Sequence, residues 1–164
     1  MSIGSLVNVL IFDWGDTIMR DFKLPGPMSE WDKIAYVPGV EQALQELTKK
    51  YVLAIATSAD HSGTEEMIAA LKRVGADKYF NHFFASKDLG YKKPDPKFFR
   101  AIINTLETIP QQCVMIGNLY EKDIVGAKAA GLHTILFDEQ KQSCVFPDAD
   151  EVIFHMSDLA KIIP

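Results

Sequence analysis

The fold class is decided by the stretch Leu6-Val7-Asn8-Val9-Leu10-Ile11-Phe12-Asp13-Trp14-Gly15-Asp16-Thr17, in which an apolar run, broken only by Asn8, ends in a polar turn. A run that is apolar on both faces is typical of a strand in a parallel sheet, because helices cover both sides of such a sheet. A carboxylate directly after the strand lies at the carboxyl edge, where open α/β sheets bind their ligands. The stretch therefore predicts a buried strand and, at Asp13, the first residue of a candidate site.

Outward from this stretch, short apolar runs alternate with segments of helical periodicity. Further strands are expected at residues 52–56, 83–85, 113–116, 134–137 and 152–154. Helices are expected at residues 39–50, 64–74, 96–106 and 122–130, and a last helix is expected to be capped by Ser157. This alternation predicts an α/β fold with a parallel sheet that is covered on both faces. Because no repeat, low-complexity stretch or linker interrupts the pattern, we expect residues 1–164 to form a single domain.

The composition is that of an ordinary globular domain with its own apolar core. The 164 residues are 48% hydrophobic and 24% charged, and the net charge is -5 without a cluster of lysines or arginines, which argues against nucleic-acid binding as the main role. Cys113 and Cys144 are too few and too far apart for a disulfide framework or a zinc site, so we expect two free thiols in a reducing cytosol. With no signal-peptide pattern and no apolar run near the ~20 residues that span a bilayer, we expect a cytoplasmic protein without a membrane partner.

Residues 18–37 form the one irregular segment of the chain, and it is long for a loop. Loops of this length are usually functional, so we expect a flap near the site. The large apolar residues of the flap could contact a substrate, or they could cover the sheet edge or a second subunit. These residues are Phe22, Leu24, Trp31 and Tyr36.

Polar residues follow three more of the predicted strands. Thr57-Ser58 follows the second strand, Lys92-Lys93 lies in the loop after the third, and Gly117-Asn118 follows the fourth, with Asp123 further along. Each alone could be a cap, a turn residue or a solvated lysine. Together with Asp13 they converge on one edge of the sheet and suit phosphoryl chemistry, which uses a carboxylate nucleophile, a cation, a hydroxyl and oxygen ligands for Mg²⁺. We expect Lys93 to turn inward and Lys92 to be solvated.

Four segments resemble the motifs of the haloacid dehalogenase (HAD) superfamily of hydrolases. They are Phe12–Thr17, Ala54–Thr57, Leu89–Pro96, and Val114–Asn118 followed by Asp123–Ala127. The third and fourth segments are the most specific, and the similarity covers most of the chain. The resemblance implies a three-layer Rossmann-like fold with a central, mostly parallel sheet. Since residues 18–37 number only 20, a short flap is expected instead of the cap domain that many members carry.

The resemblance also implies a role for each matching residue. Asp13 would be the nucleophile and form an aspartyl-phosphate, which water then hydrolyses. Lys93 would keep Asp13 anionic and offset the charge of the transferring phosphoryl group, while Thr57 and Ser58 would bind phosphate oxygens. The Mg²⁺ ligands would be Asp13, the backbone carbonyl of Gly15, Asn118 and Asp123. His61 follows the second motif closely enough to line the site.

Two positions depart from the family pattern. The family usually carries a second aspartate two residues after the nucleophile, which protonates the leaving group and later activates water, but this chain has Gly15 there. Asp16 comes next, and hydrogen bonding within the turn is its expected role. Asn118 stands where the family usually has a metal-binding aspartate, and its amide oxygen still suits Mg²⁺ without adding charge.

Three hypotheses follow from these features. The favoured one is a Mg²⁺-dependent phosphatase that cleaves a phosphomonoester, and the alternative is a catalytically weakened phosphate-binding or regulatory module. A dehalogenase or phosphonate hydrolase is disfavoured, because such relatives draw residues from a large cap domain. A capless site is open, so the resemblance points to a large or extended phosphorylated substrate, or to a site completed by a neighbouring subunit in a homo-oligomer.

Overall fold

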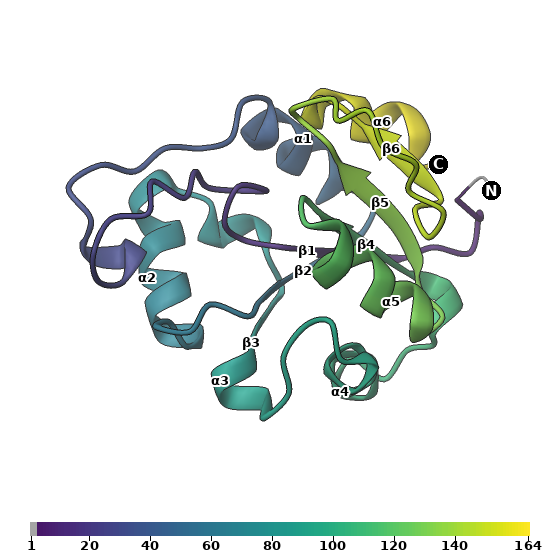
Figure 1. The fold of residues 1–164 in the computed structure, drawn as a ribbon, viewed down its shortest axis with the longest axis horizontal. Coiled ribbons are helices and arrows are strands. Elements are labelled where there is room, and N and C mark those ends of the chain that lie inside the picture. The colour runs from purple at the N-terminus through teal and green to yellow at the C-terminus, as the bar shows by residue number, and fades with distance from the viewer. Residues whose placement is uncertain (1–2) are drawn as a thin grey trace.

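The computed structural model describes residues 3–164 and is built on a six-stranded sheet in which neighbouring strands are parallel (Figure 1). The strands are β1 (Val9–Phe12), β2 (Val52–Thr57), β3 (His82–Ala85), β4 (Cys113–Gly117), β5 (His133–Phe137) and β6 (Glu151–Ile153). Their order across the sheet is β3-β2-β1-β4-β5-β6. The chain builds one edge of the sheet first and then returns past β1 to build the other, and sheets of this kind bind ligands where the order reverses.

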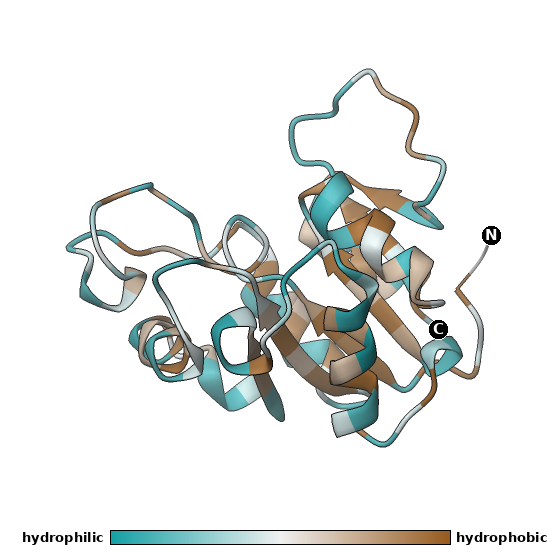
Figure 2. Ribbon diagram, turned by 60° about the horizontal axis from the view of Figure 1, so that its bottom comes forward, coloured by the Kyte–Doolittle hydropathy of each residue, from teal (hydrophilic) through white to brown (hydrophobic). Residues whose placement is uncertain are grey.

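Helices cover both faces of the sheet, which confirms the predicted three-layer α/β fold. They are α1 (Val40–Leu47), α2 (Thr64–Val74), α3 (Ser86–Leu89), α4 (Pro96–Thr105), α5 (Gly126–Ala129) and α6 (Leu159–Ile162). Leu10 and Phe12 of β1 pack into an apolar core with α1, α2 and α6, while Val9 and Ile11 pack into a second core with α4 and α5. Because successive side chains of a strand point to opposite faces, one apolar run supplies both cores. Figure 2 shows the hydrophobic strands enclosed by helices that also carry hydrophilic residues.

Two helix boundaries lie where the sequence predicts them, for local reasons. α2 ends before Gly75, which adopts the left-handed φ of 73° that favours glycine. α4 begins at Pro96, directly after Asp95, whose carboxylate accepts a hydrogen bond from the Lys97 amide at 2.9 Å. Capping chemistry encoded within a few residues therefore fixes both ends.

Two predicted elements differ from those in the structure. β1 begins at Val9 rather than Leu6, because the chain turns at Ser5 and Leu6 and leaves the Leu6 side chain 70% exposed. The helix predicted at residues 122–130 is instead a π-helical turn, Tyr120–Val125, followed by the short α5. The wide turn brings polar residues to the sheet edge, as described below.

The last helix also begins differently from the prediction. His155, not Ser157, forms the cap, and its Nδ1 accepts a hydrogen bond from the Ser157 amide at 3.2 Å. A 3₁₀ turn, Met156–Asp158, follows the cap and leads into α6. The imidazole supplies the acceptor that the sequence pattern assigned to a hydroxyl.

The flap, residues 18–37, runs beside α2 and contains a short 3₁₀ turn, Met28–Glu30 (Figure 1). Arg73 of α2 donates hydrogen bonds to three backbone carbonyls of the flap, the shortest being 2.5 Å to Trp31. The Trp31 side chain is buried, and its indole donates to the Gly26 carbonyl at 2.9 Å. The Arg73 hydrogen bonds fasten the flap to α2, and the Trp31 hydrogen bond lies within the flap.

Two expectations about the chain as a whole can be compared with the structure. Cys113 is buried, Cys144 is exposed, and both thiols are free. Among residues 3–164, no helix combines the length and the apolar character that crossing a membrane requires.

Candidate active site

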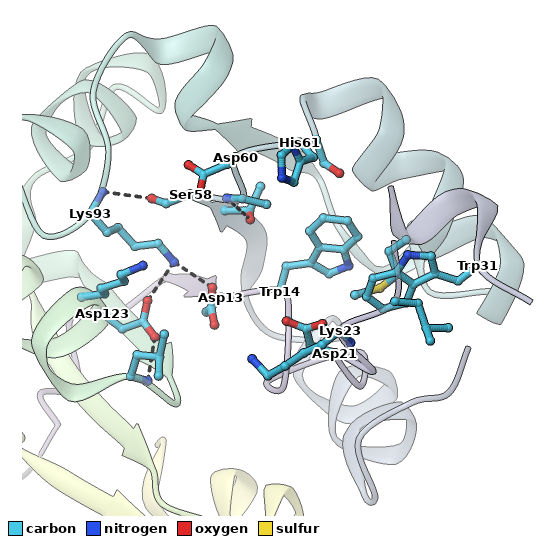
Figure 3. A pocket seen from close by; sticks show the side chains of 18 of the residues that line it. Asp13, Trp14, Asp21, Lys23, Trp31, Ser58, Asp60, His61, Lys93 and Asp123 are labelled. Carbon is cyan, nitrogen blue, oxygen red and sulfur yellow. Dashed lines mark hydrogen bonds and ion pairs between the residues drawn. The ribbon is translucent and has the colours of Figure 1, made fainter. Parts of the chain in front are cut away.

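The carboxyl ends of β1, β2 and β4 surround a pocket of about 380 Å³ (Figure 3). Six of the seven site residues predicted from the sequence line it: Asp13, Gly15, Thr57, Ser58, Lys93 and Asp123. The seventh, Asn118, lines a neighbouring hollow of about 270 Å³. The parallel topology therefore brings together residues that are far apart in the sequence, because the strands that precede them end at the same edge.

Within the pocket, Lys93 joins two buried carboxylates. Its ammonium lies 2.7 Å from Oδ1 of Asp13 and 2.8 Å from Oδ1 of Asp123, and it also donates to the Ala56 carbonyl at 3.2 Å. These three acceptors match the three hydrogens of an ammonium group. Asp13, Lys93 and Asp123 are 7%, 4% and 0% exposed, and charged residues are rarely so buried unless they are paired. Lys92 is exposed, so Lys93 is the inward-facing lysine, as expected.

Burial and neighbouring charges together raise the pKa of both Lys93 and Asp123. Burial alone lowers the pKa of the Lys93 ammonium, but the carboxylates of Asp123 and Asp13 outweigh it and raise this pKa above its usual range. For Asp123, burial and the negative charge of Asp13 outweigh the effect of Lys93 and raise the pKa to about 6. Lys93 is therefore a permanent cation, and Asp123 is a carboxylate from which a metal ion can displace the proton near neutral pH.

Asp123 reaches the site because of the residues around it. It lies in the π-helical turn Tyr120–Val125, and its Oδ2 accepts a hydrogen bond from the Leu119 amide at 3.0 Å. Gly117 leaves the necessary space, since a Cβ atom there would lie 2.3 Å from Oδ2 of Asp123. The wide turn and the glycine together direct this carboxylate to the end of β4, and such turns are frequent at functional sites.

Thr57 and Ser58 lie next to each other in the pocket but make different contacts. The hydroxyl oxygen of Thr57 accepts a hydrogen bond from the Ala59 amide at 3.1 Å, so its hydrogen is available to a bound anion. The hydroxyl oxygen of Ser58 accepts a hydrogen bond from the Lys93 amide at 2.9 Å. Ser58 therefore holds the loop that carries Lys93.

Asn118 is linked to Asp13 through Thr17. The buried Thr17 hydroxyl lies 3.2 Å from Oδ2 of Asp13 and 3.3 Å from Oδ1 of Asn118. One hydroxyl hydrogen can serve only one of these acceptors at a time. The other oxygen then remains free to bind a cation.

The donor atoms at this edge of the sheet suit Mg²⁺. Asp13 and Asp123 bring carboxylate oxygens, Asn118 brings an amide oxygen and Gly15 brings a backbone carbonyl. Mg²⁺ prefers hard oxygen ligands of this kind. In the part of the chain that the structure describes, no three His, Cys, Asp or Glu side chains form a cluster that could hold a metal ion. A cation here would therefore have two carboxylate ligands and complete its shell with neutral oxygens.

The family model for haloacid dehalogenase-like hydrolases matches residues 16–137, which include Thr57, Lys93 and Asp123. The chain belongs to the haloacid dehalogenase-like hydrolases. The resemblance noted in the four sequence motifs is therefore confirmed.

Two curated proteins that are similar to this haloacid dehalogenase-like chain are named as phosphatases. The ribulose-1,5-bisphosphate 5-phosphatase of Halopiger xanaduensis is 32% identical over 120 residues, which are 73% of this chain and 49% of that protein. The glyceraldehyde 3-phosphate phosphatase of Pyrococcus furiosus is 30% identical over 132 residues, which are 77% of this chain and 54% of that protein. The chain thus spans about half the length of the curated relatives that it matches.

A solved structure of a HAD hydrolase shares the fold. The HAD-hydrolase YfnB from Bacillus subtilis, bound to magnesium, matches with a TM-score of 0.80 at 17% identity, covering 96% of this chain and 98% of that chain. At this identity the likeness concerns the fold alone. It confirms the Rossmann-like architecture predicted for a HAD-like hydrolase.

The flap contributes some of the predicted contacts to this HAD-like site. Leu24 and Trp31 line the pocket, whereas Phe22 and Tyr36 are not among its lining residues. His61 also lines the pocket, as its position after the second motif suggested. One wall of the pocket is therefore partly apolar and comes from the flap.

Four charged residues that line the pocket were missed by sequence reasoning: Asp21, Lys23, Asp60 and Lys122. Lys122 adjoins a motif residue, Asp123, and that adjacency was a usable signal. Asp21 and Lys23 lie in the flap, where no periodicity indicates which side chains turn toward the site.

Asp16 has the expected role within the turn. It adopts a left-handed φ of 57°, and its Oδ1 accepts a hydrogen bond from the Asp21 amide at 3.1 Å. Its carboxylate also lies 3.9 Å from the guanidinium of Arg20. Asp16 lines the hollow beside Asn118, not the pocket itself, and it fixes the start of the flap.

Proposed function

We propose that this protein is a Mg²⁺-dependent phosphohydrolase that cleaves a phosphomonoester through an aspartyl-phosphate on Asp13. One observation carries the proposal: the Lys93 ammonium lies 2.7 Å from Asp13 in a pocket at the carboxyl edge of the sheet. A carboxylate nucleophile beside a permanent cation suits attack on a phosphoryl group. The phosphatase names of the curated relatives support the same class of reaction.

In the proposed reaction, an oxygen of Asp13 attacks phosphorus, and the bond between phosphorus and the ester oxygen breaks. The leaving oxygen takes up a proton. Water then attacks the same phosphorus and gives a proton to a base, the bond to Asp13 breaks, and inorganic phosphate is released. Lys93 would offset charge on the phosphoryl oxygens in both steps, and the Thr57 hydroxyl would donate a hydrogen bond to one of them.

Asp13, Asp123, Asn118 and the Gly15 carbonyl would hold the Mg²⁺. When bound, the ion would supply positive charge next to the phosphoryl oxygens. A HAD-hydrolase of the same fold was solved bound to magnesium, which supports magnesium as the cation. Because Asn118 is neutral, we propose that the site binds Mg²⁺ more weakly than a site with a third carboxylate would.

We further propose that the substrate is a phosphate ester that extends out of the pocket past the flap. Leu24 and Trp31 offer apolar surface, and Lys23 and Lys122 bring two ammonium groups to the same cavity. This combination favours an anionic substrate whose remaining part is not confined by the protein. In this proposal residues 18–37 act as the flap of a single catalytic domain, in place of a cap.

The test is hydrolysis of p-nitrophenyl phosphate by the purified protein in Mg²⁺ and in EDTA. We expect turnover in Mg²⁺ only, and Asp13→Asn should abolish it. Asp32→Asn is the matched control, because Asp32 is an exposed flap residue that does not line the pocket. Turnover that persists in EDTA or survives Asp13→Asn would contradict the proposed mechanism.

Gly15 favours one alternative, a phosphate-binding module without turnover, because a glycine side chain cannot give a proton to an alcohol leaving group. For such a module, calorimetry would detect binding of inorganic phosphate in the presence of Mg²⁺, while p-nitrophenyl phosphate and other phosphate esters would remain uncleaved. The two outcomes separate the enzyme from the binding module.

A further inference from the structure

The residues assigned so far include no group that can protonate the leaving oxygen. The three hydrogens of Lys93 already have acceptors, Asp123 is fully buried and paired, and Gly15 has no side chain. An alkoxide is a poor leaving group, and general acid help is typically worth ~10²–10⁴-fold in rate. A donor for unactivated esters must therefore come from another residue that lines the pocket.

Asp21 of the flap lies beside the open side of Gly15. A Cβ atom built at Gly15 would lie 3.6 Å from the Cβ of Asp21 and 3.9 Å from its Oδ2. Asp21 therefore borders the space into which a side chain two residues after Asp13 would extend. In Figure 3, Lys93 and Asp123 lie on one side of Asp13, and Asp21 lies on the other.

Two hydrogen bonds hold Asp21 in this position. Its amide donates to Oδ1 of Asp16 at 3.1 Å, and its own Oδ1 accepts from the Lys23 amide at 2.9 Å. Oδ2, the oxygen nearer Gly15, takes part in neither of these hydrogen bonds. General acid catalysis needs a donor that is positioned in this way.

Besides the lysines, two other titratable side chains outside the assigned set line the pocket, Asp60 and His61. Both are exposed and lie on the loop that follows β2, whereas Asp21 is half-buried. Neither borders the side-chain position next to the nucleophile, which Asp21 does. The contacts therefore favour Asp21 as the proton donor.

We propose that Asp21 is the general acid and base of this site, supplied by the flap in place of a side chain at position 15; this inference rests on the proposed function. Protonated Asp21 gives the proton on Oδ2 to the leaving oxygen as its bond to phosphorus breaks. The resulting carboxylate then takes a proton from the water that attacks the aspartyl-phosphate. The acid is thereby restored at the end of each turnover.

The test compares p-nitrophenyl phosphate with a panel of alkyl phosphates that includes glycerol 3-phosphate, all in Mg²⁺. The aryl leaving group departs as a stable anion, whereas an alkoxide needs a proton. Asp21→Asn keeps the Oδ1 acceptor for the Lys23 amide, so the flap should remain folded. It should lower kcat/KM roughly 100-fold for the alkyl esters and less than roughly 10-fold for the aryl ester. Asp32→Asn should change neither value.

Gly15→Asp separates a proton-transfer role of Asp21 from a structural one. In the double variant, Gly15→Asp places a carboxyl group beside the amide that replaces the Asp21 carboxyl. The kcat/KM for alkyl phosphates should then be roughly 10-fold or more above that of Asp21→Asn alone. Introduced alone, Gly15→Asp brings a second carboxylate against Asp21 and should not raise turnover. A merely structural defect at Asp21 would not be repaired from position 15.

The possible failures are distinguishable. Two outcomes would overturn the role of Asp21 and leave the proposed function intact. In one, the wild type turns over the aryl ester alone; in the other, Asp21→Asn lowers kcat/KM by the same factor for both leaving groups. An unchanged Asp21→Asn variant would have the same meaning. A wild-type protein that turns over none of these esters in Mg²⁺ would overturn both proposals.

Discussion

A Cβ atom at Gly117 would lie 2.3 Å from Oδ2 of Asp123, so the last residue of β4 makes room for a carboxylate that belongs to the following turn. The other oxygen of this carboxylate lies 2.8 Å from the Lys93 ammonium. Gly117 therefore sets the position of Asp123 although it contributes no functional group of its own.

Gly117→Ala tests whether this position matters. The added methyl group should displace Asp123 and weaken Mg²⁺ binding roughly 10- to 100-fold, the usual cost of losing a group that orients a metal ligand. Isothermal titration calorimetry measures the change. Gly4→Ala is the matched control, because a Cβ atom there makes only ordinary contact with His133, at 3.8 Å. Unchanged Mg²⁺ affinity in Gly117→Ala would remove Asp123 from the proposed ligands.

Lys93→Met should destabilise the protein by about 3–5 kcal/mol at pH 7, because it leaves two buried carboxylates without their cation. The loss depends on pH. Without Lys93, the folded-state pKa of Asp123 should rise above its present value of about 6, while the unfolded chain titrates near 4. The folded variant then holds its proton more tightly than the unfolded chain, so stability is retained at low pH and lost as pH rises through the folded pKa.

Urea denaturation at pH 4.5 and pH 7 measures this difference. The loss of unfolding free energy in Lys93→Met, relative to the wild type, should be smaller at pH 4.5 than at pH 7. Lys92→Met is the control, since Lys92 is exposed and should have little effect at either pH. A deficit that does not change with pH would mean that Lys93 acts through packing and not through charge.

Much of the site could be predicted because parallel strands end at one edge. Asp13 directly follows β1 and Thr57 is the last residue of β2; because these strands are neighbours in the sheet, the proximity of the two residues follows from topology. Lys93 belongs to the same edge because β3 pairs with β2. Residue type and position relative to a strand were sufficient for these three.

The start of β1 could not be predicted, because it depends on partners elsewhere in the chain. Val9 pairs with Val52 of β2 and with Cys113 of β4, and both partner strands begin at these residues. Leu6, although apolar, precedes the paired region and is exposed. A local apolar run therefore does not show where strand pairing begins.

The position of Asp21 was equally hidden from local patterns. The flap reaches the site through distant contacts, including the hydrogen bonds from Arg73 of α2 to the flap backbone. The absence of a side chain at Gly15 was visible in the sequence, but the residue beside that space was not. Only the path of the flap shows that Asp21 lies there.

Asp150→Asn tests a partly buried ion pair outside the site. Oδ1 of Asp150 lies 2.5 Å from the Lys128 ammonium, Oδ2 accepts from the Thr134 amide at 3.0 Å, and the side chain is 5% exposed. Although burial alone raises the pKa of Asp150, these hydrogen bonds outweigh it and lower the pKa below its usual value. Their stabilisation is therefore present above the unfolded pKa, near 4, and is lost as pH falls through the folded pKa.

The substitution should cost about 1–3 kcal/mol of unfolding free energy at pH 7 and much less at pH 2, measured by urea denaturation. Asp158→Asn removes a surface carboxylate that pairs with Lys161, and it should have little effect at either pH. If Asp150→Asn lowers the unfolding free energy by the same amount at both pH values, Asp150 stabilises the protein through its shape and not through its charge.

Asn118→Asp tests the neutral position in the proposed metal shell. The Thr17 hydroxyl lies within 3.3 Å of Asn118 and 3.2 Å of Asp13, so a carboxylate at position 118 would add negative charge close to Asp13. Without metal, this repulsion should lower the Tm. With Mg²⁺, a third carboxylate ligand should tighten binding, and the rise in Tm on adding Mg²⁺ should exceed that of the wild type.

Thermal unfolding with and without Mg²⁺, together with calorimetry, measures both effects. Asn104→Asp introduces the same charge at an exposed position on α4 and should leave Mg²⁺ affinity unchanged. If Asn118→Asp binds Mg²⁺ no more tightly than the wild type, Asn118 lies outside the metal shell. Mg²⁺ would then be bound by Asp13, Asp123 and the Gly15 carbonyl. The phosphate of the substrate would have to supply the negative charge that these protein ligands lack.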